Sequence, residues 1–288
     1  MAKKKQKTVD IASVDNVNTA SPFAQLPASV KLPPVSLAYL PFGLLIDHVS
    51  SFLKIGALFA LLISAASFIF GYAYICTVGA SVDFPCAQES TAIPFYLLLK
   101  YFLIFLFAIK WYQLLKGANL NLKSVFSINR NEMRAMGLLA FLLVLNLAPM
   151  LSFYLLWIRD PNPDVVVEVT YFAIVSTGFA VPLVVLRFYS LLGFAVDGKS
   201  LPPIKYLWHL TSGNTLKILI ALFFIFFMAF FIFFNFYTNI LGAVHQDVLW
   251  LGISSEIIYE FLLLLLMCLF IGHCFVQKQL LFGDETHE

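Results

Sequence analysis

The segment Phe223–Phe234 (FFIFFMAFFIFF) is apolar at every position. A strand of a membrane β-barrel alternates, because its two faces meet lipid and the barrel interior in turn. A helix surrounded by hydrocarbon is apolar on all sides instead. The segment therefore predicts a transmembrane helix, and it favours an all-α membrane protein over a barrel.

The composition of the whole chain agrees with that prediction. Of its 288 residues, 61% are hydrophobic and 12% are charged, whereas a typical soluble domain is about 25% charged. Several apolar runs reach the roughly 20 residues that a helix needs to cross hydrocarbon. We expect a polytopic helical bundle with six transmembrane helices, at about residues 52–76, 93–115, 136–158, 169–192, 217–241 and 251–276.

The ends of the chain differ from this central region. Residues 1–36 have no apolar periodicity and predict a disordered cytoplasmic tail. The basic start, Lys3 to Lys7, is not followed by an apolar core, so no secretory signal peptide is expected. The transmembrane domain is predicted over 37–280, and a cytoplasmic C-terminal tail over 281–288.

The basic residues predict the orientation. With the N-terminus inside, 16 of the 18 Lys and Arg residues lie in cytoplasmic segments or adjoining helix ends. The outer loops contain Arg159, and Lys100 lies within the second span. This positive-inside bias predicts a multi-pass protein of the bacterial inner membrane with both termini in the cytoplasm. A net charge of +2 does not favour binding to nucleic acid.

Three cytoplasmic connections share a pattern of mixed polarity that is typical of a helix lying in the membrane interface. They are Pro41–Ser51, Leu120–Arg134 and Pro203–Asn214, which precede the first, third and fifth spans. Asp47, Asn129 and His209 fall at similar places, about 81 residues apart. This predicts three copies of a unit in which an interfacial helix precedes a transmembrane hairpin. The alternative is that any six-helix protein with short loops has a similar period.

The segment Phe188–Leu219 (FYSLLGFAVDGKSLPPIKYLWHLTSGNTLKIL) combines an apolar helix, a charged turn, a helix with Trp208, and Thr211-Ser212-Gly213-Asn214 before the next span. It resembles the bacterial six-helix proteins grouped around the membrane domain of glycerophosphodiester phosphodiesterases. The resemblance implies the six-span topology and no catalytic residue, and the soluble phosphodiesterase domain of that group is absent.

The same element also has a structural interpretation. Thr211 or Ser212 can cap the fifth span, and Gly213-Asn214 suits a turn from the interface into the membrane. The alternative is a binding role for His209 or Asn214.

A candidate polar site involves the second and sixth spans. Lys100 lies about one turn inside the outer surface, and Glu256 and Glu260 share one face of the sixth span because they are four residues apart. Intramembrane charges often mark an ion pathway, a proton pathway or a head-group site. The alternative is that Lys100 extends to the outer surface and the glutamates mark the start of a long helix.

Cysteine and histidine residues offer little further chemistry. Cys76 and Cys86 flank the first outer loop and either form a disulfide or are ordinary small residues. Cys268 and Cys274 are predicted to be packing residues. His273 has no second ligand at a suitable spacing, so no metal and no cofactor is predicted, and no catalytic motif is found.

We therefore expect a non-enzymatic protein of membrane organisation, assembly or lipid-related support. Its expected partners are the lipid bilayer and either further copies of itself or another membrane protein. The alternative is a small transporter or channel, whose polar site would combine Lys100, Glu256, Glu260, Asn146 and Asn235, with kinks at Pro149 and Pro182. A lipid-modifying enzyme is a third hypothesis, and it requires two acidic or His residues to meet at one interface.

Overall fold

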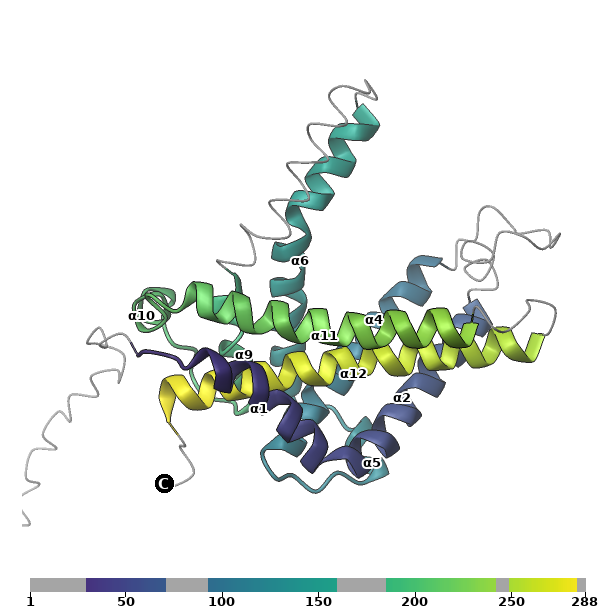
Figure 1. The fold of residues 1–288 in the computed structure, drawn as a ribbon, viewed down its shortest axis with the longest axis horizontal. Helices are drawn as coiled ribbons and strands as arrows, with labels where there is room; N and C mark the ends of the chain where they lie inside the picture. The colour runs from purple at the N-terminus through teal and green to yellow at the C-terminus, as the bar shows by residue number, and fades with distance from the viewer. Residues whose placement is uncertain (1–29, 71–92, 160–184, 242–248, 284–288) are drawn as a thin grey trace, which may run out of the picture.

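The computed structural model describes residues 30–70, 93–159, 185–241 and 249–283, and every regular element within them is a helix (Figure 1). The long helices are α2 (Val49–Phe70), α4 (Ile93–Leu115), α6 (Arg130–Arg159), α11 (Thr215–Leu241) and α12 (Leu249–Phe282). The shorter ones are α1 (Pro34–Asp47), α5 (Leu122–Phe126), η2 (Leu186–Phe188), α9 (Leu191–Val196) and α10 (Ile204–Leu210). The all-α prediction is confirmed for this part of the chain.

Three of the helices are long and apolar enough to cross a membrane, which is typical of a membrane protein. They are Val49–Ser67, Phe95–Leu115 and Glu256–Phe282. A fourth candidate is the pair α10 and α11, whose axes differ by 84° at a short break. The third predicted span lies within α6, whereas most of the fourth, 169–192, lies outside the described residues.

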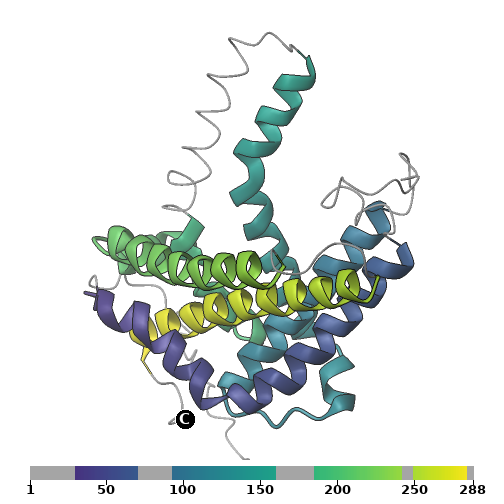
Figure 2. The same ribbon diagram turned by 45° about the vertical axis from the view of Figure 1, so that its right-hand side comes forward.

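Several helix ends converge at one end of the molecule, which we call the base. The start of α2 meets the end of α4, because the rings of His48 and Phe52 contact Trp111 edge-on at 6.4 and 6.0 Å between centroids. The end of α12 meets α9 and α10, where Phe282 lies 4.8 Å from Phe194 and 6.5 Å from Tyr206. From the base, α6 diverges from the α11–α12 pair (Figures 1 and 2).

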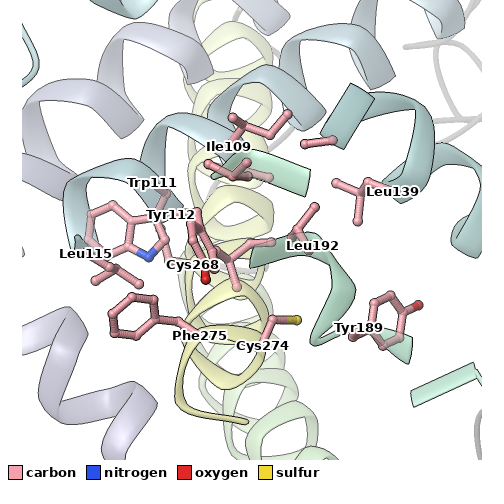
Figure 3. Close-up of a cluster of buried hydrophobic side chains, with 14 of the residues drawn as sticks. Ile109, Trp111, Tyr112, Leu115, Leu139, Tyr189, Leu192, Cys268, Cys274 and Phe275 are labelled. Carbon is pink, nitrogen blue, oxygen red and sulfur yellow. The ribbon is translucent and has the colours of Figure 1, made fainter. Parts of the chain in front are cut away.

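Helices α4 and α12 are neighbours that run in the same direction. Near their starts Lys100 contacts Glu260, and near their ends the rings of Tyr112 and Phe275 are 5.4 Å apart. The buried side chains around this contact come from α4, α6, α9 and α12 and from Tyr189, which precedes α9 (Figure 3). Cys268 and Cys274 are free and buried there, as expected of packing residues.

The backbone of Gly193 lies against this core. A Cβ atom at Gly193 would overlap the Tyr112 hydroxyl and the Lys278 side chain. Glycine is therefore required for α9 to approach α4 and α12 this closely.

The packed part of the chain starts earlier than the predicted boundary at residue 37. The Val30 N–H donates to the Leu210 carbonyl at 3.3 Å, and Leu32 is 1% exposed. Pro34 suits the first position of α1 because its missing N–H would have no partner there. Helix α1 then packs on α12, where Gly272 leaves room for Pro41. Residues 1–29 and 284–288, which make up most of the predicted tails, lie outside the described residues.

Candidate functional site

The predicted polar site is centred on a buried ion pair between α4 and α12. The Lys100 ammonium contacts the Glu260 carboxylate, and the two side chains are 12% and 0% exposed. The ammonium also lies 5.5 Å from the centre of the Tyr259 ring and 5.9 Å from that of Tyr96. An ammonium this close to two aromatic rings gains further electrostatic stabilisation. The ammonium is therefore enclosed between α4 and α12, and whether it reaches the outer surface of the bilayer stays a prediction.

Glu256 lies one turn before Glu260 on α12 and is half-buried. Lys100 pairs with Glu260 through the Oε1 atom of that carboxylate. The other carboxylate oxygen of Glu260, Oε2, is buried without a hydrogen-bond partner among the described residues. That oxygen can accept a proton or a donor from a small ligand. The role of the three residues in an ion or proton pathway stays a prediction.

Other residues predicted for this site lie beyond what the structure describes. The side chains of Asn146, Pro149 and Asn235 belong to helices α6 and α11 but are not placed. Pro182, Cys76 and Cys86 lie outside the described residues, so the disulfide stays a prediction as well.

A second polar cluster lies at the base, around the start of α6. Glu132 Oε1 accepts hydrogen bonds from Lys110 Nζ and Gln113 Nε2 of α4, both at 2.7 Å. Glu132 and Asn129 also bond to each other's backbone N–H groups, at 3.0 and 2.9 Å. This reciprocal capping box fixes the start of α6 and aims the Glu132 carboxylate at Lys110. Sequence reasoning missed the cluster, although the Asn-x-x-Glu spacing was a usable signal.

A third cluster, the base triad, joins Lys116, Asp197 and Lys278. The two Asp197 carboxylate oxygens accept hydrogen bonds from Lys116 Nζ at 2.6 Å and from Lys278 Nζ at 2.7 Å. Burial alone would raise the pKa of Asp197, but the two ammonium groups outweigh it and hold the pKa below its ordinary value. Both lysines contribute to the predicted orientation, whereas no local sequence pattern marks Asp197 as their partner.

The turn after Asp197 is packed against the start of α6. Gly198 has a φ of +70°, and a Cβ atom there would overlap the Asn131 side chain. The Lys199 carbonyl accepts a hydrogen bond from Arg134 Nη1 at 3.2 Å. The chain leaves the base along α6. By Gly198 it has returned to the base and lies beside the first turns of α6.

The Trp208–Asn214 element bends the chain and holds a segment near the N-terminus. The Thr211 hydroxyl donates to the Leu207 carbonyl at 2.7 Å at the end of α10. Helix α11 begins at Thr215, so its N-cap position is Asn214 and is held by neither of the predicted caps, Thr211 and Ser212. Gly213 has a φ of +77°, which suits the turn into α11. The Asn214 amide accepts from the Leu32 N–H at 2.9 Å and donates to the Val30 carbonyl. Asn214 therefore binds this chain's own backbone, and His209 is exposed.

No protein-family model matches the chain, and no curated protein or solved structure matches it significantly. Among the described residues no group of three or more His, Cys, Asp or Glu side chains is arranged to hold a metal ion.

Proposed function

We propose that this protein is a non-enzymatic, six-span membrane protein that organises or assembles membrane components or supports lipid. The observation that carries the proposal is the base triad, because Asp197 joins the ends of helices from three predicted hairpins. A carboxylate neutralised by two ammonium groups is suited to holding helices together. It is poorly suited to general acid or base chemistry, which needs a proton that leaves readily near neutral pH.

Two observations support six spans. Helix α6 has 30 residues, so it carries the chain about 45 Å from its start, yet Gly198 and Lys199 lie beside that start. The intervening chain must return over this distance, as a span at 169–192 would do. Moreover, α4 and α12 run in the same direction, which requires an odd number of crossings between them.

The base triad also supports three repeated hairpins. Lys116, Asp197 and Lys278 are separated by 81 residues in each step, the same period as the predicted interfacial helices. The first long helix of each unit also contacts the unit before it in a cyclic order: α2 packs on α12, α6 on α4 and α11 on η2. We therefore propose an approximate threefold axis through the base. If the three units were identical, three lysines would meet at this axis and repel each other. Because the units differ in sequence, the second unit has Asp197 where the other two have Lys116 and Lys278.

The remaining parts of the proposal follow from the basic residues and the resemblance. The base lies on the side where Lys and Arg accumulate, which supports a cytoplasmic location for it and for both termini in a bacterial cell. The proposed relatives are the six-helix proteins of the glycerophosphodiester phosphodiesterase membrane-domain group. The proposed partners are the bilayer and either further copies of this chain or another membrane protein.

The Lys100–Glu260 pair favours a second candidate function, a small transporter or channel. Buried charges within membrane helices are expensive and often belong to transport pathways. Glu260 Oε2 has the free acceptor capacity that a transported proton or cation would need.

One experiment separates the two candidates. The tagged protein would be extracted from its own cells with the surrounding lipid, and companion proteins and lipids identified against an unrelated six-span protein of equal abundance. The purified protein would also be reconstituted in liposomes, and fluxes of H⁺, Na⁺ and K⁺ measured. We expect a reproducible companion and no flux above that of protein-free liposomes. A flux that Lys100→Met abolishes would establish the transporter instead, and the absence of any companion would contradict the organising role.

A further inference from the structure

Arg187 is a half-buried cation that meets no carboxylate in the part of the chain that the structure describes. Within the described residues it makes one hydrogen bond, from Nη2 to the Thr215 hydroxyl, and its buried Nε has no acceptor. Four lysines differ from Arg187 in this respect, because each of them contacts a carboxylate. They are Lys100, Lys110, Lys116 and Lys278. A buried N–H group without an acceptor is costly and rare. Arg187 therefore lacks an anionic partner that its environment calls for.

The surroundings of Arg187 are those of a membrane interface. Its guanidinium carbon lies 4.0 Å from the centre of the Trp208 ring on α10. Trp208 and Ile204 are 44% and 68% exposed, and α10 is bent by 84° from α11. If α11 crosses the membrane, α10 lies along its surface with Trp208 at the depth of the lipid headgroups.

The local charge favours an anion. Lys205 is exposed on α10, and Lys217 lies half-buried in the first turn of α11. Asp197 is the one acidic residue between 185 and 217, and Lys116 and Lys278 already neutralise it. There is also room for a ligand at the adjacent turn, because a Cβ atom at Gly213 would meet nothing within 4 Å.

We propose that Arg187, Trp208 and Thr215 form a binding site for the phosphate of an anionic phospholipid headgroup. The planar guanidinium matches phosphate oxygens with two parallel N–H donors. The Trp208 ring holds the guanidinium plane and offers an apolar surface to the glycerol and upper acyl chain. This site specifies the ligand of the proposed lipid-related role and rests on the proposed membrane arrangement.

Direct lipid binding to the purified, delipidated protein tests the site. Native mass spectrometry would be used to titrate phosphatidylglycerol and phosphatidylcholine onto the wild type, Arg187→Gln and Lys54→Gln. Lys54 is the matched control, because it is an exposed base on α2 that carries the same charge. We expect the wild type to prefer phosphatidylglycerol, Arg187→Gln to bind it about tenfold more weakly, and Lys54→Gln to bind it like the wild type.

Two further measurements complete the test. Arg187→Lys keeps the charge but loses the paired donors, so it should bind phosphatidylglycerol severalfold more weakly even if Arg187→Gln does not fold. Inorganic phosphate at millimolar concentration should leave the melting temperature unchanged. Equal losses in Arg187→Gln and Lys54→Gln would overturn the site in favour of diffuse surface charge. Stabilisation by inorganic phosphate would identify a soluble anion instead. Neither result depends on companion proteins or flux, so the proposed function is tested separately.

Discussion

Asp197 carries the most consequence among the single residues of this protein. It is 6% exposed and forms ion pairs with both Lys116 and Lys278. Removing one partner of a buried ion pair usually costs more than the pair contributes, because the remaining charge is left buried. At this position two ammonium groups would remain, and the buried one is that of Lys278, whose side chain is 11% exposed, whereas that of Lys116 is 44% exposed.

Asp197→Asn should lower the free energy of unfolding by about 3 kcal/mol near neutral pH. The pKa of Asp197 is lowered in the folded protein, so its stabilisation is complete above the ordinary aspartate value of about 3.9 and decreases as the pH falls through the lowered value. Melting temperatures in detergent between pH 3 and pH 7 would check this. The gap between wild type and variant should be constant from pH 7 to 5 and narrow below about pH 4. A gap that widens in acid would contradict the assignment.

Residue chemistry was predictable where it depends on spacing along one helix. Glu256 and Glu260 share a face of α12 because they are four residues apart, and Lys100 contacts Glu260 on that face. Which glutamate is used depends on the rotation of α12 against α4, which spacing does not determine. Asp197 was overlooked because its partners are 81 residues away in both directions.

At the scale of elements, the base is held by close approaches between helices that differ greatly in length. Helix α9 has 6 residues, yet all of them are buried between longer neighbours. Its Gly193 leaves no space for a side chain. Short helices of this kind take their stability from packing and not from helix propensity.

Gly193→Ala should therefore be destabilising, by about 1–3 kcal/mol, because the added methyl group displaces Tyr112 or Lys278. Gly137→Ala on α6 is the matched control, since a Cβ atom there meets nothing within 4 Å. It should be neutral or stabilising, because alanine favours a helix more than glycine does. Thermal unfolding of both variants would measure the difference. Equal effects would show that α9 does not approach α4 and α12 this closely.

Residues 30–33, which we call the strap, precede α1, and Asn214 forms hydrogen bonds with their backbone. A variant that begins at Val30 after its initiator Met should unfold at the wild-type temperature, since the strap remains. A variant that begins at Pro33 should lose about 3 kcal/mol, because it lacks the buried Leu32 side chain and the hydrogen bonds of Val30 and Leu32 to Leu210 and Asn214. Differential scanning fluorimetry of the two truncations checks this, and equal melting temperatures would disprove the anchoring role of Leu32.

Element boundaries were predictable where composition changes sharply. The second span was predicted at 93–115, and α4 has these bounds. The start of the packed region was predicted too late, because Leu32 and Leu37 are isolated apolar residues whose burial depends on distant α10, α11 and α12. The break between η2 and α9, at residues 189–190, lies inside the predicted fourth span and was not predicted, since local apolarity does not distinguish a continuous helix from a broken one.

For the whole molecule, the sequence predicted an apolar helical protein, and three membrane-length helices confirm that class. The number of spans and their direction stay predictions. The direction depends on the distribution of Lys and Arg among the loops and helix ends. The number of spans depends on residues 71–92 and 160–184, which the structure does not describe.

Labelling of single cysteines would determine the direction. In a variant without native cysteines, Asp164→Cys should react with a membrane-impermeant maleimide in intact spheroplasts. Ser212→Cys, in the exposed turn between α10 and α11, should react only after the membrane is opened. The reverse pattern would invert the proposed topology, and labelling of both from one side would contradict the six spans.

The Lys100–Glu260 pair also has a consequence for biosynthesis. The two residues are separated by 160 positions, so at about 5–20 residues per second the carboxylate emerges from the ribosome roughly 8–32 s after the lysine. During that interval α4 enters the bilayer with an unpaired ammonium group, which favours delayed insertion or protection by an insertion factor. In a nascent chain that is halted before α12, α4 should therefore be inserted less stably. Synthesis of α12 would then supply Glu260 and stabilise α4 in the bilayer.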